Sequence, residues 1–153
     1  MYSLLSFIGI LVGILIARYT KEELKQGKKY FLWMERISLI LVSVVLIYYY
    51  KPSWTVFLGL ALGYFIELNY FAFGLILVLT QNIIASLIIF IYGLPYGSMI
   101  NKEKTKKILK ELILFTTPAL LLIDNIGIAY QKELVSFAVG MLLIRGANWK
   151  FRR

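Results

Sequence analysis

Residues 55–92 read TVFLGLALGYFIELNYFAFGLILVLTQNIIASLIIFIY, and this stretch decides the class of fold. A helix needs roughly 20 residues to cross the hydrocarbon core of a bilayer. The stretch is too long for one such helix and long enough for two, about Thr55 to Tyr70 and about Phe71 to Tyr92. Its only polar interruptions among acids and amides are Glu67–Asn69 and Gln81–Asn82.

The rest of the chain has the same apolar character. Of 153 residues, 60% are hydrophobic and 16% are charged, and the mean hydropathy is +0.78. Ordinary soluble domains have about 25% charged residues, and so small a body cannot hide this much apolar surface from water. We therefore expect a single integral membrane domain, residues 1–153, in the cell membrane.

Four more apolar segments flank the central stretch. They run over Met1 to Ala17, about Ile37 to Tyr50, Leu112 to Ile123 with a continuation to Tyr130, and about Leu134 to Ile144. The first follows no basic residue and precedes no small-residue cleavage site, so we expect a retained helix. The predicted fold class is all-α, a polytopic transmembrane helical bundle of about six helical segments, one of them re-entrant or broken.

The connections between these segments carry turn and cap signals. Gly93, Pro95 and Gly97 lie close together and predict a turn after the central stretch. Asn101 precedes a basic stretch with helical propensity, and is expected to cap a short surface helix that ends near Glu111.

The distribution of basic residues bears on the number of crossings. The chain has 17 Lys and Arg against 8 Asp and Glu, a net charge of +9. Six complete crossings would leave seven basic residues on one side and ten on the other. If Thr55 to Ile66 dips in and returns, the division becomes fifteen against two, as the positive-inside rule favours. Loops 18–36 and 102–110 would then both be cytosolic, although six complete crossings remain open.

Small residues at four-residue spacing predict close helix packing. Gly9 and Gly13 form one such pair, and Gly59 and Gly63 form another. Glycines four apart share a helix face and let two backbones approach closely in lipid. They serve packing within one chain or a seam between two copies. Short segments of the two halves are weakly similar in sequence, for example 12–18 and 139–145. The similarity indicates either a duplicated three-helix unit or a chance match between apolar segments.

Polar groups within apolar segments are costly in a bilayer and are functional candidates for that reason. The acids are Glu67 and Asp124. Together with nearby amides they form the predicted transport-pathway residues: Glu67, Asn69, Gln81, Asn82, Asp124 and Asn125. Such a set suits a proton, Na⁺ or a small cationic or zwitterionic solute.

Each polar group also has a plainer interpretation. Glu67 and Asp124 would be inexpensive at helix ends in the headgroup layer. Gln81 and Asn82 would lie near the middle of the fourth segment, where amides often join neighbouring helices. The basic loops would either anchor the topology or hold anionic lipid headgroups.

Several chemistries are excluded by composition. The chain has no Cys and no His, which removes disulfides, thiolate nucleophiles and Cys/His metal centres. No glycine-rich phosphate loop and no nucleophile elbow is present. We therefore predict no catalytic residue, no metal and no cofactor. Nucleic-acid binding is disfavoured, because membrane orientation explains the positive charge.

A membrane enzyme with an acid pair of Glu67 and Asp124 stays open, because the sequence does not give their distance, and two functions are favoured over it. The first is a small membrane transporter or channel-like protein that moves an ion or small solute through a polar site between helices. The alternative is a non-catalytic membrane subunit or scaffold that packs against partner membrane proteins. The expected partners are the lipid bilayer, anionic headgroups at the basic loops, and a second copy or another membrane protein.

Overall fold

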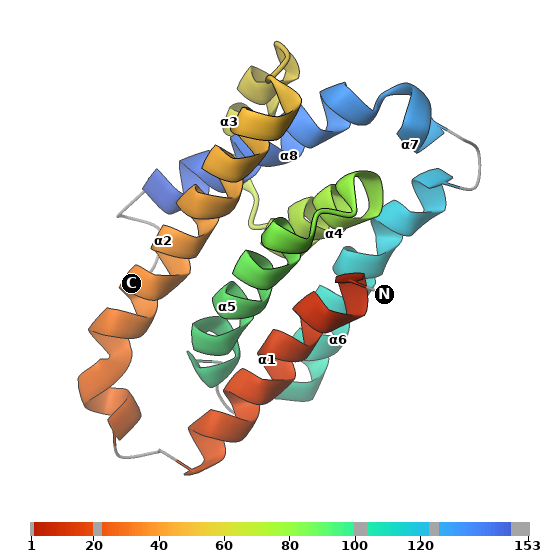
Figure 1. Cartoon of the computed structure of the whole chain (residues 1–153). Helices are drawn as coiled ribbons and strands as arrows, with labels where there is room; N and C mark the ends of the chain where they lie inside the picture. Colours follow the sequence, from red (N-terminus) through yellow and green to blue (C-terminus); the bar gives the residue numbers. More distant parts are fainter. Residues whose placement is uncertain (1, 20–22, 100–103, 123–125, 148–153) are drawn as a thin grey trace.

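The computed structural model describes residues 2–19, 23–99, 104–122 and 126–147, and the regular structure within them is entirely helical (Figure 1). The elements are α1 (Tyr2–Tyr19), α2 (Glu23–Tyr50), α3 (Thr55–Phe65), α4 (Asn69–Thr80), α5 (Ile83–Met99), α6 (Lys104–Thr116), the 3-10 segment η1 (Thr117–Leu122), α7 (Ile126–Ala129) and α8 (Gln131–Ala147). The predicted all-α class is confirmed.

Two predicted boundaries are wrong. α2 begins at Glu23 rather than near Ile37, because the Lys, Glu and Leu residues of this basic stretch are good helix formers. α5 continues through the expected turn at Gly93–Gly97, with Pro95 inside the helix. A Cβ at Gly93 or Gly97 would collide with the α1 backbone, so close packing against α1 offsets the hydrogen bond that Pro95 removes.

The described parts of the basic stretches, 18–19, 23–36 and 104–110, belong to helices that meet at one end of the bundle, which we call the basic end (Figure 1). α1 and α5 pack side by side and both finish there, and α2 and α6 start there. The opposite end contains Lys51 and the start of α8. There the Ser53 amide donates to the Ser136 hydroxyl at 2.9 Å, and the Thr55 hydroxyl donates to the Glu133 carbonyl at 2.7 Å.

The central apolar stretch folds into α3, a turn at 66–68 and α4, followed by α5. α3 packs on α8, and α4 packs on α8, α6 and η1; we call α3, the turn and α4 the α3–α4 hairpin. The Tyr50 hydroxyl donates to the Thr80 carbonyl at 3.4 Å, so α4 ends beside the point where α2 ends and α3 soon begins. The hairpin therefore starts and finishes at the opposite end. Its turn at 66–68 lies away from that end, and Ile66 and Glu67 in it are exposed. The expected short helix over Thr55 to Ile66 is present and ends at Phe65.

The fourth predicted segment, about Phe71 to Tyr92, is not one helix. It is divided at Gln81 and Asn82 into α4 and α5. Gln81 has a positive φ of 46°, which ends α4 in the left-handed region and reverses the chain.

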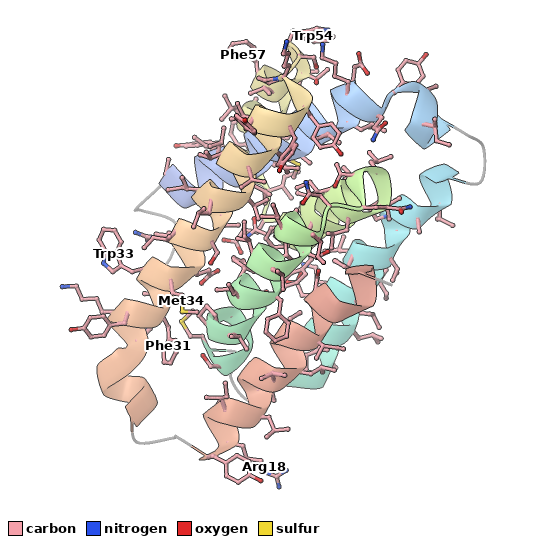
Figure 2. All side chains as sticks on the ribbon, in the orientation of Figure 1. Arg18, Phe31, Trp33, Met34, Trp54 and Phe57 are labelled. Carbon is pink, nitrogen blue, oxygen red and sulfur yellow. The ribbon has the colours of Figure 1, made fainter. Side chains whose placement is uncertain are left out.

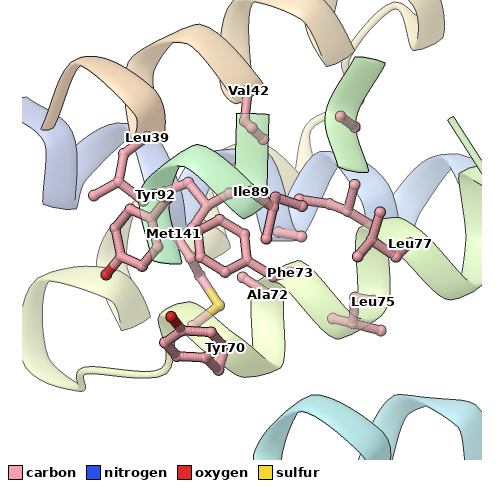
Figure 3. Packing of buried hydrophobic residues seen from close by; sticks show 14 of the residues in the cluster. Leu39, Val42, Tyr70, Ala72, Phe73, Leu75, Leu77, Ile89, Tyr92 and Met141 are labelled. Atoms are coloured by element: carbon pink, nitrogen blue, oxygen red, sulfur yellow. The ribbon is translucent and has the colours of Figure 1, made fainter. Parts of the chain in front are cut away.

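Glycine contacts hold the two tightest helix pairs. A Cβ at Gly9 would collide with the Phe90 carbonyl oxygen of α5, and one at Gly59 would collide with the Phe137 carbonyl oxygen of α8. α1 therefore packs on α5, and α3 on α8, at backbone contact. α4 packs against α8, α6 and η1, and forms the centre of the core (Figure 3).

The surface is apolar and part of the interior is polar. On α2, Ile37, Leu41 and Val44 are about half exposed, whereas Ser38 and Ser43 are buried. These serines donate to backbone carbonyls four residues earlier. Trp33, Trp54 and Phe57 extend away from the bundle (Figure 2). Water-soluble monomers rarely expose apolar surface on this scale.

By length and composition, one helical segment in the described ranges can cross a bilayer: Gly27–Tyr50, within α2. The other apolar helical segments are shorter and cover Ile8–Tyr19, Thr55–Phe65, Asn69–Thr80 and Ile83–Met99.

Candidate functional site

The turn of the α3–α4 hairpin is held by an ion pair. A guanidinium nitrogen of Arg145 lies 3.3 Å from a carboxylate oxygen of Glu67. The Arg145 side chain is 8% exposed and the Glu67 side chain is 62% exposed, so the cation is buried and the anion is open. Arg145 is in the last turn of α8, where the helix dipole favours a positive charge.

The first residue of α4 starts a second polar chain on the inner side of the turn. The Asn69 amide nitrogen donates to the Tyr92 hydroxyl oxygen at 3.0 Å. The same hydroxyl donates to a carboxylate oxygen of Glu35 at 3.0 Å. Three helices, α4, α5 and α2, therefore meet at one hydroxyl group.

Glu35 is the most buried acid among the described residues for which exposure is given, at 5%. It lies within Gly27–Tyr50, the segment long enough to cross a bilayer. It shares one face of α2 with Leu39, Val42 and Leu46, which are also buried. A carboxyl group enclosed in this way is costly unless hydrogen bonds or charges compensate it.

Aromatic rings surround the polar chain. Tyr92 contacts Phe73 at a centroid distance of 4.8 Å and Tyr70 at 5.9 Å, both edge to face (Figure 3). Tyr92 itself has no exposed surface. We refer to Glu35, Glu67, Asn69, Tyr92 and Arg145 together as the hairpin-tip site.

A similar pair lies one helical turn further along α5. The Tyr96 hydroxyl donates to a Glu111 carboxylate oxygen at 2.7 Å, and the Tyr96 ring stacks on Tyr92 at 5.7 Å. Glu111 is only half-buried and belongs to α6. This pair joins α6 to α5 beside the site, and it provides a chemical match to the buried Tyr92–Glu35 pair.

The structure divides the predicted pathway residues. Glu67 and Asn69 lie at the hairpin tip, whereas Gln81 and Asn82 lie at the other end of α4, about 18 Å away for a helix of 12 residues. Asn82 caps α5, since its side-chain oxygen accepts from the amides of Ile84 and Ala85 at 2.8 and 3.2 Å. Placement of these two residues in the middle of a segment is therefore wrong. Asp124 and Asn125 lie outside the described residues.

Three members of the site were missed in the sequence. In the sequence, Glu35 lies in the basic loop 18–36, Arg145 directly follows the last apolar segment, and Tyr92 ends the fourth one. None of the three was predicted to belong to a site. The available signal was the spacing of Glu35, Leu39, Val42 and Leu46, which places the acid on the apolar inner face of a helix.

The chemistry of the site is that of a carboxylate met by hydrogen-bond donors. Among the residues searched in the described ranges, no three acids, His or Cys gather in a way that could hold a metal ion. No family model, no curated protein and no solved structure matches the chain.

Proposed function

We propose that the chain is a polytopic membrane protein in which the α3–α4 hairpin is re-entrant. Lipid is the natural solvent for a surface of Ile, Leu, Phe and Trp that encloses serines and glycines. A hairpin that enters and leaves at one end also places loops 18–36 and 102–110 on the same side, which the positive-inside rule assigns to the cytosol.

On this basis the protein is a small transporter or channel-like carrier that moves an ion or small solute through the hairpin-tip site. The single observation that carries the proposal is the polar turn of the hairpin, where Glu67 pairs with Arg145 of α8 and the adjoining Asn69 donates to Tyr92 of α5. Irregular backbone at membrane depth is tolerated where it is buried in protein or lines a watery cavity. Carriers use such discontinuous helices to build their binding sites.

The exposure of Glu67 supports a path to the site. An ionised acid that faces hydrocarbon costs several kcal/mol. Glu67 is mostly exposed although it lies about 16 Å along α3 from the opposite end, so water or substrate must reach it. Buried Arg145 holds the carboxylate from one side and leaves the other side open.

Flux measurements with the full chain in vesicles of phosphatidylethanolamine and phosphatidylglycerol test this proposal. Proton entry, followed with an internal pH dye, and uptake of radioactive Na⁺ are compared with protein-free vesicles. We expect the wild type to pass at least one of the two cations, and Glu67→Gln or Asn69→Leu to reduce that flux strongly. Lys132→Gln, an exposed change outside the site, is the matched control.

A wild-type flux equal to that of protein-free vesicles for both cations would end the cation-carrier proposal. The alternative function, a non-catalytic membrane subunit or scaffold, would then take its place. One observation favours it: Phe65 and Ile66 next to Glu67 are exposed, and a partner membrane protein could cover this tip. The scaffold predicts that Ala at Phe65, Ile66 or Glu67 leaves flux, like that of the wild type, at the level of protein-free vesicles.

The basic end accounts for the expected lipid partner. On α6, Lys106 and Lys110 are exposed beside exposed Leu109 and Ile113, so the helix presents basic and apolar surface together. A helix with this pattern lies in the headgroup layer and attracts anionic lipid.

A further inference from the structure

The buried acid of the hairpin-tip site has an arrangement that favours one particular ion. Glu35 receives the Tyr92 hydroxyl hydrogen, and Tyr92 in turn receives the Asn69 amide hydrogen. The Tyr92 hydroxyl therefore presents its hydrogen atom toward the carboxylate, and the Asn69 amide orients that hydroxyl. A metal cation needs several oxygen lone pairs, whereas a proton needs only one carboxylate oxygen.

The groups near Glu35 come from neighbouring helices. Tyr92 of α5 donates to the carboxylate, and Tyr70 of α4 lies against the Tyr92 ring. The end of α8 reaches this level of α2, because a Cβ at Gly146 would lie 3.4 Å from the Arg36 carbonyl oxygen. Buried Glu35 therefore meets the Tyr92 hydroxyl away from bulk water, where a carboxyl group can hold a single proton.

We propose that Glu35 binds and releases the proton that this protein moves, or whose gradient it uses. The inference rests on the proposed carrier function and names its ion. One proton adds to a carboxylate oxygen of Glu35 and later leaves from it, so the step needs no oxidant or reductant. Tyr92 is a positioning residue, because its hydroxyl orients the carboxylate and stabilises the charged form. Asn69 links this change of charge to the hairpin turn.

The test compares two chemically matched acids in the vesicles described above, with the internal pH dye. Glu35→Gln should reduce proton entry to the level of protein-free vesicles. Glu111→Gln removes the α6 carboxylate that accepts from Tyr96, one turn beyond Tyr92 on α5, and should leave proton entry unchanged. Tyr92→Phe should slow proton entry and shift the carbonyl band of protonated Glu35 in the infrared measurement below, because the carboxyl group loses a hydrogen-bond donor. A purely structural role of Tyr92 would lower the rate without moving that band.

An infrared measurement in detergent tests the same site without flux. The wild type should develop the carbonyl band of a protonated carboxylic acid as the pH falls, and Glu35→Gln should lack that component. Folding of each variant is checked by circular dichroism and gel filtration, and Glu35→Asp should restore proton entry in part if Glu35→Gln folds poorly.

The outcomes separate the two proposals. Proton entry that persists in folded Glu35→Gln would overturn the assignment of Glu35 and leave the carrier function standing. Na⁺ uptake without proton entry or proton dependence would do the same. A wild type that passes neither cation would remove the carrier function and this inference with it.

Discussion

Two polar breaks interrupt the apolar stretch from Thr55 to Met99, and the protein satisfies them in different ways. At the outer break, Asn82 accepts from backbone amides two and three residues ahead. At the inner break, Glu67 and Asn69 bond to residues 78 and 23 positions away. At the outer break the polar side chain of Asn82 makes a local cap, and other helices reach only the neighbouring Leu79 and Thr80 carbonyls, through Gln131 and Tyr50. At the inner break the polar side chains themselves bond to other helices.

The difference explains why the inner break is the better candidate for function. A cap can form wherever a helix starts, and it needs no tertiary structure. Buried side-chain bonds between helices are made only in one fold, and a change in one member alters the others. Residues that move a substrate require this second kind of connection.

The largest expected effect on stability concerns the Tyr92–Glu35 pair beside the inner break, compared with the half-buried Tyr96–Glu111 pair. Tyr92→Phe removes one hydroxyl that serves both Glu35 and Asn69, and leaves a buried carboxylate and a half-buried amide without it. We expect a loss of about 1–3 kcal/mol in the free energy of unfolding, measured in mixed micelles. Tyr96→Phe should cost less than about 1 kcal/mol, because half-buried Glu111 can bond to water instead. Equal costs for the two variants would contradict this distinction.

Local signals in the sequence predicted most of the helices. Apolar run lengths predicted helices near α1 and α8, and the polar group at Glu67–Asn69 marked the end of α3 correctly. The turn predicted at Gly93, Pro95 and Gly97 is wrong, because α5 packs there against α1, more than 80 positions away in the sequence. A turn rule considers neighbours along the chain and cannot include a helix that packs from the other side.

The site was predicted only where its residues break an apolar run. Glu67 and Asn69 stand out against Phe65, Ile66 and Leu68. Glu35 stands beside Arg36 and near several lysines, so its charge resembles that of a surface loop. Its burial is decided by the packing of α2 on α5 and α8, which only the tertiary structure contains. The roles of Asp124 and Asn125 stay predictions.

A smaller effect is expected at the outer break. Asn82→Ala removes the cap of α5 and should lower the free energy of unfolding by about 1 kcal/mol, whereas Asn82→Asp or Asn82→Ser should retain most of it. Thermal or denaturant unfolding in mixed micelles measures both. Cation flux of the folded variant should equal that of the wild type. A flux that falls while stability holds would return Asn82 to the pathway and remove the contrast between the breaks.

The smallest expected effect is that of glycine on the free energy of unfolding, and it should have opposite signs at the two breaks. Gln81 holds a φ of 46°, a conformation in which glycine avoids the steric cost of a Cβ. Gln81→Gly should therefore raise the free energy of unfolding by about 0.5 kcal/mol, after the entropy that glycine adds to the unfolded chain is subtracted. Among the described non-glycine residues only Lys51 and Gln81 have positive φ, so glycine gains no such advantage at Glu67. Glu67→Gly instead removes the ion pair with Arg145 and should lower stability. A gain at both positions would mean that the inner turn is a local structure like the outer one, and that the bonds to α8 and α5 do not determine its shape.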